Sequence, residues 1–170
     1  LQLHVRETEM ENMPKAFDAI FFDLDGTLLP MDLAGFTDHY FQLLANHFEG
    51  LGVDSKPIIH AVMHATQAMI QNDGTCSNAQ RFRSCFMQEM GEQAGSFIRN
   101  FDGFYNAAFH QTRAFTQPNP DAVTAVAAAR KKASHVVLAT NPLFPAAGIQ
   151  ARLSWIGLHI SDFDCVTTYE

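Results

Sequence analysis

A short apolar segment that runs directly into two closely spaced carboxylates is the feature that most limits how this chain can fold. Residues 17–22 (Phe-Asp-Ala-Ile-Phe-Phe) have the length of a strand and are apolar at nearly every position, a pattern typical of strands buried on both faces of a parallel sheet. Asp23 and Asp25 follow, and in an extended chain this spacing turns both side chains to one side, roughly 7 Å apart. Gly26 permits a sharp turn with positive φ, and Thr27 adds a hydroxyl. The sequence therefore predicts a buried strand that ends in a pair of carboxylates.

This carboxylate pair suits phosphoryl transfer. Two acids held side by side repel each other unless a cation lies between them or one of them is protonated. Mg²⁺, a hard divalent ion that prefers oxygen ligands, relieves that repulsion. One carboxylate can then attack a phosphorus atom and form an aspartyl-phosphate, while the other protonates the leaving oxygen and later deprotonates a water.

Three other interpretations of the segment compete with this one. Apolar residues on both sides of Asp25-Gly26 also fit a β-hairpin with a type I′ turn, and this alternative stays open. An EF-hand loop requires an acid at position 21 and a Glu at position 32, where the chain has Phe21 and Asp32. A solvated acidic turn does not fit, because the preceding residues are too apolar for a surface.

Residues 22–28 (Phe-Asp-Leu-Asp-Gly-Thr-Leu) resemble the first motif of the haloacid dehalogenase (HAD) superfamily. The resemblance implies a Rossmann-like α/β core with a parallel sheet. It also implies that Asp23 is the nucleophile, Asp25 is the general acid and base, and Mg²⁺ is the cofactor. In that family the metal binds the side chain of the first Asp, here Asp23, and the backbone carbonyl of the second, here Asp25.

The composition limits which binding partners and which cellular compartment we expect for the protein. The net charge is −7 and the pI about 5.5, which argues against binding to a nucleic-acid backbone. With 47% apolar residues the chain can bury a core, yet no run approaches the roughly 18 apolar residues of a membrane helix. No signal segment opens the chain, and residues 1–13 form a polar tail to which we assign no function. The three cysteines have no metal-type spacing, so we expect reduced thiols in a cytoplasmic protein.

Residues 31–115 show helical periodicity throughout. Apolar residues recur at helical spacing in four segments, and Gly or Asn-Asp-Gly sequences separate them. We expect a small helical bundle whose Phe and Met stripes form its core rather than the wall of a ligand site. By resemblance, this insertion is the helical cap of HAD enzymes related to phosphoglycolate phosphatase and β-phosphoglucomutase, which closes over the active site and selects the substrate. The predicted domains are therefore a cap at 31–115 and an α/β core at 14–30 and 116–170.

His60 and His64 have the i, i+4 spacing of a zinc site on a helix. However, Ala61 stands where metalloproteases carry a Glu, and no third ligand is evident from the sequence. The pair therefore indicates a solvated or partly packed helix face rather than a metal site.

The segment after Pro118 alternates between helices and strands. Residues 122–133 predict an Ala-rich helix, residues 135–140 a second buried strand, residues 145–157 another helix and residues 162–168 the start of a third strand. Strands separated by helices give βαβ units and a parallel sheet.

Thr140 ends the second predicted strand, and the carboxyl ends of strands are where open α/β sheets bind ligands. It resembles the Thr or Ser of the second HAD motif. The resemblance implies that Thr140, together with the backbone around Leu24 and Asp25, holds phosphoryl oxygens. Asn141 either also binds a phosphoryl oxygen or only shapes the turn before Pro142, and both interpretations stay open.

Two further HAD motifs, one supplying a Lys and one supplying acids for the metal, have no counterpart here. There is no Lys after Lys132, and Asp162 and Asp164 precede a strand rather than follow one, so we expect them to cap a turn. We therefore expect an N-terminal part of a longer protein, with a core of three strands, an exposed sheet edge and no activity of its own.

The sequence as a whole predicts a Mg²⁺-dependent phosphatase that acts on a small phosphorylated metabolite. A phosphomutase of the same family remains an alternative. So does a non-catalytic module that binds a phosphorylated ligand or a partner, if the protein ends at residue 170. The sequence specifies neither the substrate nor the oligomeric state.

Overall fold

The computed structural model of the protein describes residues 15–170, so the predicted tail at 1–13 lies outside the described residues. Strands β1 (Phe17–Phe22), β2 (Ala133–Leu138) and β3 (Cys165–Val166) form one parallel sheet in the order β1-β2-β3. The predicted α/β architecture with a parallel sheet is thus present. The hairpin alternative is wrong, because β1 pairs in parallel with β2, more than a hundred residues away in the sequence.

The prediction that β1 is buried on both faces is also wrong. Ile20 and Phe22 lie opposite Val136 and Leu138 of β2, and this face of the sheet packs into the hydrophobic core. Side chains alternate between the two faces of a strand, so Phe21 points the other way, and it is 66% exposed. Within residues 15–170, β1 is an edge strand with one open face.

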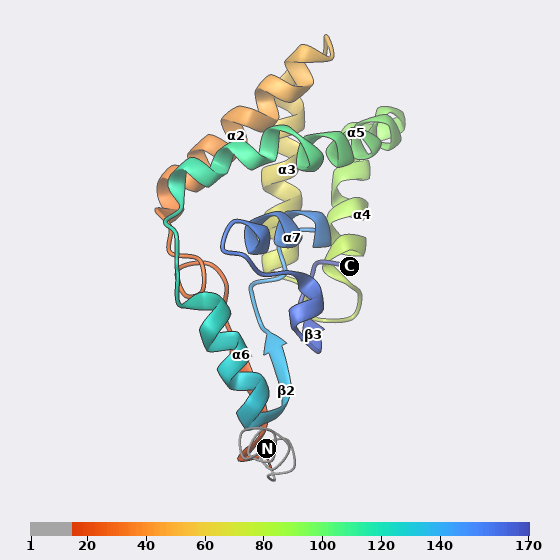
Figure 1. Ribbon diagram of the computed structural model, residues 1–170. Coiled ribbons are helices and arrows are strands. Elements are labelled where there is room, and N and C mark those ends of the chain that lie inside the picture. The colour runs from red at the N-terminus through yellow and green to blue at the C-terminus, as the bar shows by residue number, and fades with distance from the viewer. Residues whose placement is uncertain (1–14) are drawn as a thin grey trace, which may run out of the picture.

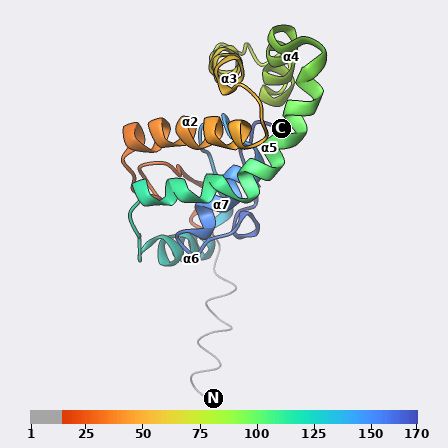
Figure 2. The same cartoon turned by 90° about the horizontal axis from the view of Figure 1, so that it is seen from above.

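The four helices expected in residues 31–115 are present. They are α2 (Leu33–Gly50), α3 (Ser55–Ile70), α4 (Asn78–Met90) and α5 (Ala94–Asn106), and they are followed by the 3₁₀ segment η2 (Ala108–Phe115). Polar side chains cap three of the helix starts: Asp32 accepts from the Gly35 N–H, Asp54 from the Lys56 N–H, and Ser77 forms a capping box with Gln80. In Figure 2, α2 lies alongside the α5–η2 segment, while α3 and α4 pair at one end.

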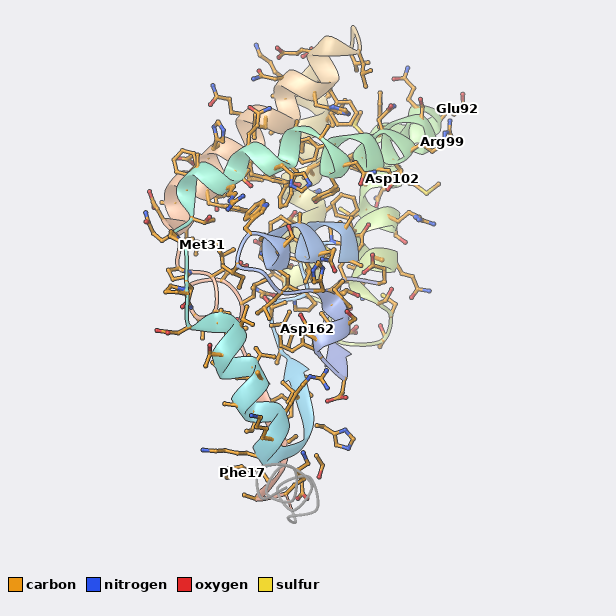
Figure 3. The ribbon with its side chains drawn as sticks, in the orientation of Figure 1. Phe17, Met31, Glu92, Arg99, Asp102 and Asp162 are labelled. Atoms are coloured by element: carbon orange, nitrogen blue, oxygen red, sulfur yellow. The ribbon has the colours of Figure 1, made fainter. Side chains whose placement is uncertain are left out.

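Two chain segments lie side by side where the helices join the rest of the molecule. Met31 forms an isolated antiparallel bridge with Thr116, and the Gln117 N–H donates to the Pro30 carbonyl at 2.8 Å. Figure 3 labels Met31 at this connection. Gly35 allows the close approach, because a Cβ at this position would lie 2.5 Å from the Phe115 ring.

The remaining helices hold the sheet against this helical layer. Helix α6 (Ala122–Lys132) runs beside β2 (Figure 1), and α7 (Ala146–Ser154) packs against α5 and η2. A short 3₁₀ turn, η3 (Ile160–Asp162), precedes β3. Asp162 caps this turn by accepting from the His159 N–H, as expected. Asp164 instead accepts from the Val136 N–H at 2.7 Å and so ties the start of β3 to β2.

No helix in the described part of the chain is long and apolar enough to cross a membrane. The three cysteines are free thiols.

Candidate active site

The loop after β1 is fixed by its own backbone and by buried leucines. Gly26 adopts φ +82°, a conformation that glycine reaches without steric cost, and its N–H donates to the Leu29 carbonyl at 2.8 Å. The side chains of Leu24 and Leu29 are fully buried. Because Leu24 is anchored in the core, the residues on either side of it, Asp23 and Asp25, are held at the surface of a pocket.

The ends of β1 and β2 are joined by a direct hydrogen bond. The Ala139 N–H donates to the Phe22 carbonyl at 2.7 Å, so the residue that follows Ala139 lies next to the carboxylate loop. The Thr167 hydroxyl donates to the Thr140 carbonyl at 2.6 Å, and this bond fixes the backbone from the side of β3. Thr140 is consequently buried at the carboxyl edge of the sheet.

A single pocket of about 380 Å³ brings together four of the predicted site residues, namely Asp23, Asp25, Thr140 and Asn141. Leu24, the fifth, can contribute only its backbone because its side chain is fully buried. The rest of the lining comes from helices α2 and α3 and from the loop after β2: Leu33, Phe36, Thr37, Tyr40, Phe41, Thr66, Leu143 and Phe144. The chemical roles assigned to these residues from the sequence stay predictions.

Two oxygen atoms at this edge of the sheet are buried and have no hydrogen-bond partner among residues 15–170. They are Oδ1 of Asp25 and Oγ1 of Thr140. Buried polar atoms without a partner are rare in folded proteins, because leaving one unsatisfied costs about 1–3 kcal/mol. A ligand in the pocket would relieve this cost, since an acceptor and a hydroxyl here match the polar groups of a hydrated phosphate.

Arg152 of α7 is a site residue that the sequence interpretation missed. Its side chain is fully buried; Nη1 contacts Oδ2 of Asp25, Nε donates to the Gly148 carbonyl at 3.1 Å, and the guanidinium lies 4.3 Å from the Phe144 ring centroid. A sequence signal existed: position 152 lies three residues after Ile149 and so falls on the apolar stripe of this helix. A charged residue on a buried stripe needs a partner, and here the partner is Asp25.

The Asp23 carboxylate fits a magnesium ion that keeps much of its water. The Thr27 hydroxyl donates to Oδ2 of Asp23 at 3.0 Å, which leaves the other oxygen of Asp23 available as a ligand. No group of three or more His, Cys, Asp or Glu side chains in the described residues could hold a metal ion. Mg²⁺ needs no such group, since it is usually bound by one or two carboxylates together with water and substrate phosphates.

Tyr40, in the wall contributed by α2, pairs with the buried Tyr105 of α5. The hydroxyls of Tyr40 and Tyr105 lie 3.2 Å apart. Burial raises the pKa of Tyr40 to about 12, and burial also raises that of Tyr105 well above its usual value. Both phenols are therefore neutral at physiological pH. The predicted helical core and the pocket wall overlap here, because Phe36 and Tyr40 are buried in the core and also line the pocket.

His60 and His64 lie away from this pocket, on the outer face of α3. Their side chains are 78% and 58% exposed, and both face the carboxylate of Glu89 on α4. This pairing of two imidazoles with one carboxylate joins the two helices. The pKa of Glu89 is lowered, first by the hydrogen bond from His64.

A family model described as a haloacid dehalogenase-like hydrolase matches residues 17–168, nearly the whole chain. No curated protein matches the chain.

Proposed function

The chain belongs to the haloacid dehalogenase-like hydrolase family, and we propose that it carries the nucleophile of a Mg²⁺-dependent phosphatase. The substrate is a small phosphomonoester, and the reaction runs through an aspartyl-phosphate on Asp23. One observation carries the proposal: Asp23, Asp25 and Thr140 line one pocket, in which buried oxygens of Asp25 and Thr140 lack partners among residues 15–170.

In the first half of the reaction, an oxygen of the Asp23 carboxylate attacks phosphorus, and the bond between phosphorus and the leaving oxygen breaks. Asp25 gives a proton to that oxygen, so the alcohol leaves neutral. Arg152 occupies Oδ2 of Asp25, which leaves Oδ1 as the atom that carries the proton. Thr140 donates its hydroxyl to a phosphoryl oxygen.

In the second half, Oδ1 of Asp25 takes a proton from a water, and the resulting hydroxide attacks phosphorus. The bond between phosphorus and Asp23 breaks, which frees inorganic phosphate, restores the Asp23 carboxylate and leaves Asp25 protonated on Oδ1, as it was at the start of the reaction. Mg²⁺, held by the Asp23 side chain and the Asp25 carbonyl, would neutralise charge on the phosphoryl group. Backbone groups at Leu24 and Asp25 and, on the open side, Asn141 complete the proposed contacts.

We further propose that residues 31–115 act as a cap over a core formed by residues 14–30 and 116–170. The adjoining segments at Met31 and Thr116 support this division, because the chain crosses between the two parts only there. The pocket supports it as well, since its lining combines the carboxylate loop with helices α2 and α3.

The proposal is tested in the complete protein, by release of inorganic phosphate from a panel of phosphomonoesters with Mg²⁺ present. Asp23→Asn is expected to abolish turnover, because the amide cannot serve as the nucleophile. Asp18→Asn is the matched control: Asp18 is an exposed residue of β1 and does not line the pocket. Trapping the wild-type protein with substrate should add the mass of one phosphoryl group, and that group should map to Asp23.

Full phosphate release by the Asp23→Asn variant contradicts the mechanism. Transfer of the phosphoryl group to a second position of a sugar phosphate, without release of phosphate, would instead identify a phosphomutase.

A further inference from the structure

The pocket has two chemically different parts. Asp23, Asp25 and Thr140 form the part that would meet a phosphoryl group. The remaining wall is mainly carbon and comes from the first turns of α2 and from the loop after β2: Leu33, Phe36, Tyr40, Phe41, Leu143 and Phe144. An alcohol group bonded to the phosphorus would therefore lie against aromatic and aliphatic side chains.

No cation lines this pocket within residues 15–170. The only ionisable lining residues are Asp23, Asp25 and Tyr40, and Tyr40, with a pKa of about 12, is neutral. Arg152 lies behind Phe144 and is paired with Asp25. A carboxylate or second phosphate on the substrate would thus enter the pocket without a partner, and burying an unpaired charge is costly.

Of the three hydroxyl groups in the helical wall, those of Thr37 and Tyr40 are already engaged, which leaves only that of Thr66 on α3. The Thr37 hydroxyl donates to the Leu33 carbonyl at 2.8 Å, and the Tyr40 hydroxyl pairs with Tyr105. A polyol such as a sugar would lose hydrogen bonds to water without replacing most of them. An apolar ring loses none, and it gains contact with the aromatic side chains of the wall, Phe36, Tyr40 and Phe41.

From these observations we propose that the site accepts monophosphate esters of uncharged, largely apolar alcohols of about the size of a six-membered ring. The volume of about 380 Å³ is near the lower end of the range for small-molecule sites, roughly 300–1,000 Å³, and it suits a phosphate with one ring. This inference rests on the proposed phosphatase function and adds the class of substrate.

A matched set of esters, assayed with the complete protein, tests the proposal. Cyclohexylmethyl phosphate, glucose 6-phosphate and 4-carboxycyclohexylmethyl phosphate are all esters of primary alcohols on a six-membered ring. They therefore differ in polarity and charge more than in the reactivity of the leaving group. We expect kcat/KM for cyclohexylmethyl phosphate to exceed that for each of the other two by about 10-fold or more. Equal values, or a preference for the sugar or the carboxylate, overturn the proposal.

A charge placed in the apolar wall sharpens the test. Leu33 lines the pocket and is 63% exposed, so Leu33→Lys should leave the fold intact. It is expected to raise kcat/KM for the carboxylated ester relative to the plain ester by roughly 3- to 5-fold, the effect of an exposed ion pair. Leu51→Lys is the matched control, because Leu51 is 51% exposed at the other end of α2 and does not line the pocket. An equal shift in both variants, or none in Leu33→Lys, contradicts the assignment of the wall.

Binding separates this inference from the proposed function. Calorimetric titration of the Asp23→Asn protein with the same three esters reports recognition without turnover. Tighter binding of cyclohexylmethyl phosphate supports the substrate class even if the wild-type protein hydrolyses none of the esters, in which case the phosphatase proposal alone fails. Tighter binding of glucose 6-phosphate overturns the substrate class whatever the activity.

Discussion

Two ionic contacts in this molecule join distant elements in contrasting surroundings. At the pocket, Arg152 is fully buried and contacts Asp25, whose side chain is 25% exposed. On the outer face of α3 and α4, His60 and His64 meet Glu89, with the imidazoles 78% and 58% exposed. Water solvates the charges of the outer contact whether or not it forms, whereas the pocket contact is the main compensation for a buried cation.

The difference indicates which contact the fold depends on. Breaking a buried ion pair leaves a charge without solvent, while breaking an exposed pair returns both groups to water. The pocket contact also links the carboxylate loop to α7, so it has a second consequence, the orientation of Asp25. The three predictions below test this contrast, beginning with the largest expected effect.

Replacing Arg152 by Met should give the largest loss of stability. The variant leaves the partly buried carboxylate of Asp25 without its cation and removes the stacking on Phe144, so we expect a loss of about 3 kcal/mol in the free energy of unfolding. Urea denaturation measures it. Arg130→Met is the control: Arg130 is 42% exposed and lies 4.0 Å from Asp164, so its loss should be below about 1 kcal/mol. Similar losses of stability in the two variants would show that the contribution of Arg152 to the free energy of unfolding does not depend on its burial.

The sequence predicted the meeting of Asp23, Asp25 and Thr140 at one edge of the sheet because that arrangement follows from local rules. An apolar run, a glycine with positive φ and a hydroxyl at a strand end each act over a few residues, and parallel strands bring their carboxyl ends to the same edge. The helices between the strands were predicted for the same reason, since helical periodicity is a local property.

Contacts set by packing between distant elements were not predicted. The pairing of Arg152 with Asp25 spans 127 positions, and the meeting of Glu89 with two histidines depends on how α4 lies against α3. The exposure of Phe21 was missed because an apolar run specifies a strand but not how many of its faces are covered. The double role of Phe36 in core and pocket likewise depends on where α2 sits above the sheet.

The tyrosine pair extends the comparison to a buried contact between neutral groups. The pKa of Tyr40 is raised to about 12 in the folded protein by burial, so folding favours the protonated phenol. Its contribution to stability is fully present below pH 10 and is lost as the pH rises from 10 through 12. The wild-type protein should therefore lose stability over this range. Tyr40→Phe should lose less over the same range, although it is less stable by about 1 kcal/mol at pH 7.

Thermal unfolding between pH 8 and pH 12 measures this difference. The matched control is a conservative change at a tyrosine outside the pair, Tyr169→Phe, for which the same burial argument is weaker because this residue is only partly buried. Parallel pH profiles of the wild type and Tyr40→Phe would contradict the assignment of the alkaline loss to Tyr40.

The smallest effect is expected on the exposed side, in Glu89→Gln. The pKa of Glu89 is lowered, chiefly by the hydrogen bond from His64, so folding favours the carboxylate. Its contribution is present above the unfolded pKa near 4.5 and is lost as the pH falls through the lower folded value. The wild-type protein should therefore be destabilised on acidification slightly more than Glu89→Gln.

Thermal unfolding at pH 7 and at pH 4 provides the measurement. The control is Glu92→Gln, because Glu92 is an exposed glutamate in the turn after α4. A loss in Glu89→Gln at pH 7 as large as that in Arg152→Met would mean that exposure to water does not weaken the contact between α3 and α4, and the contrast with the pocket would fail.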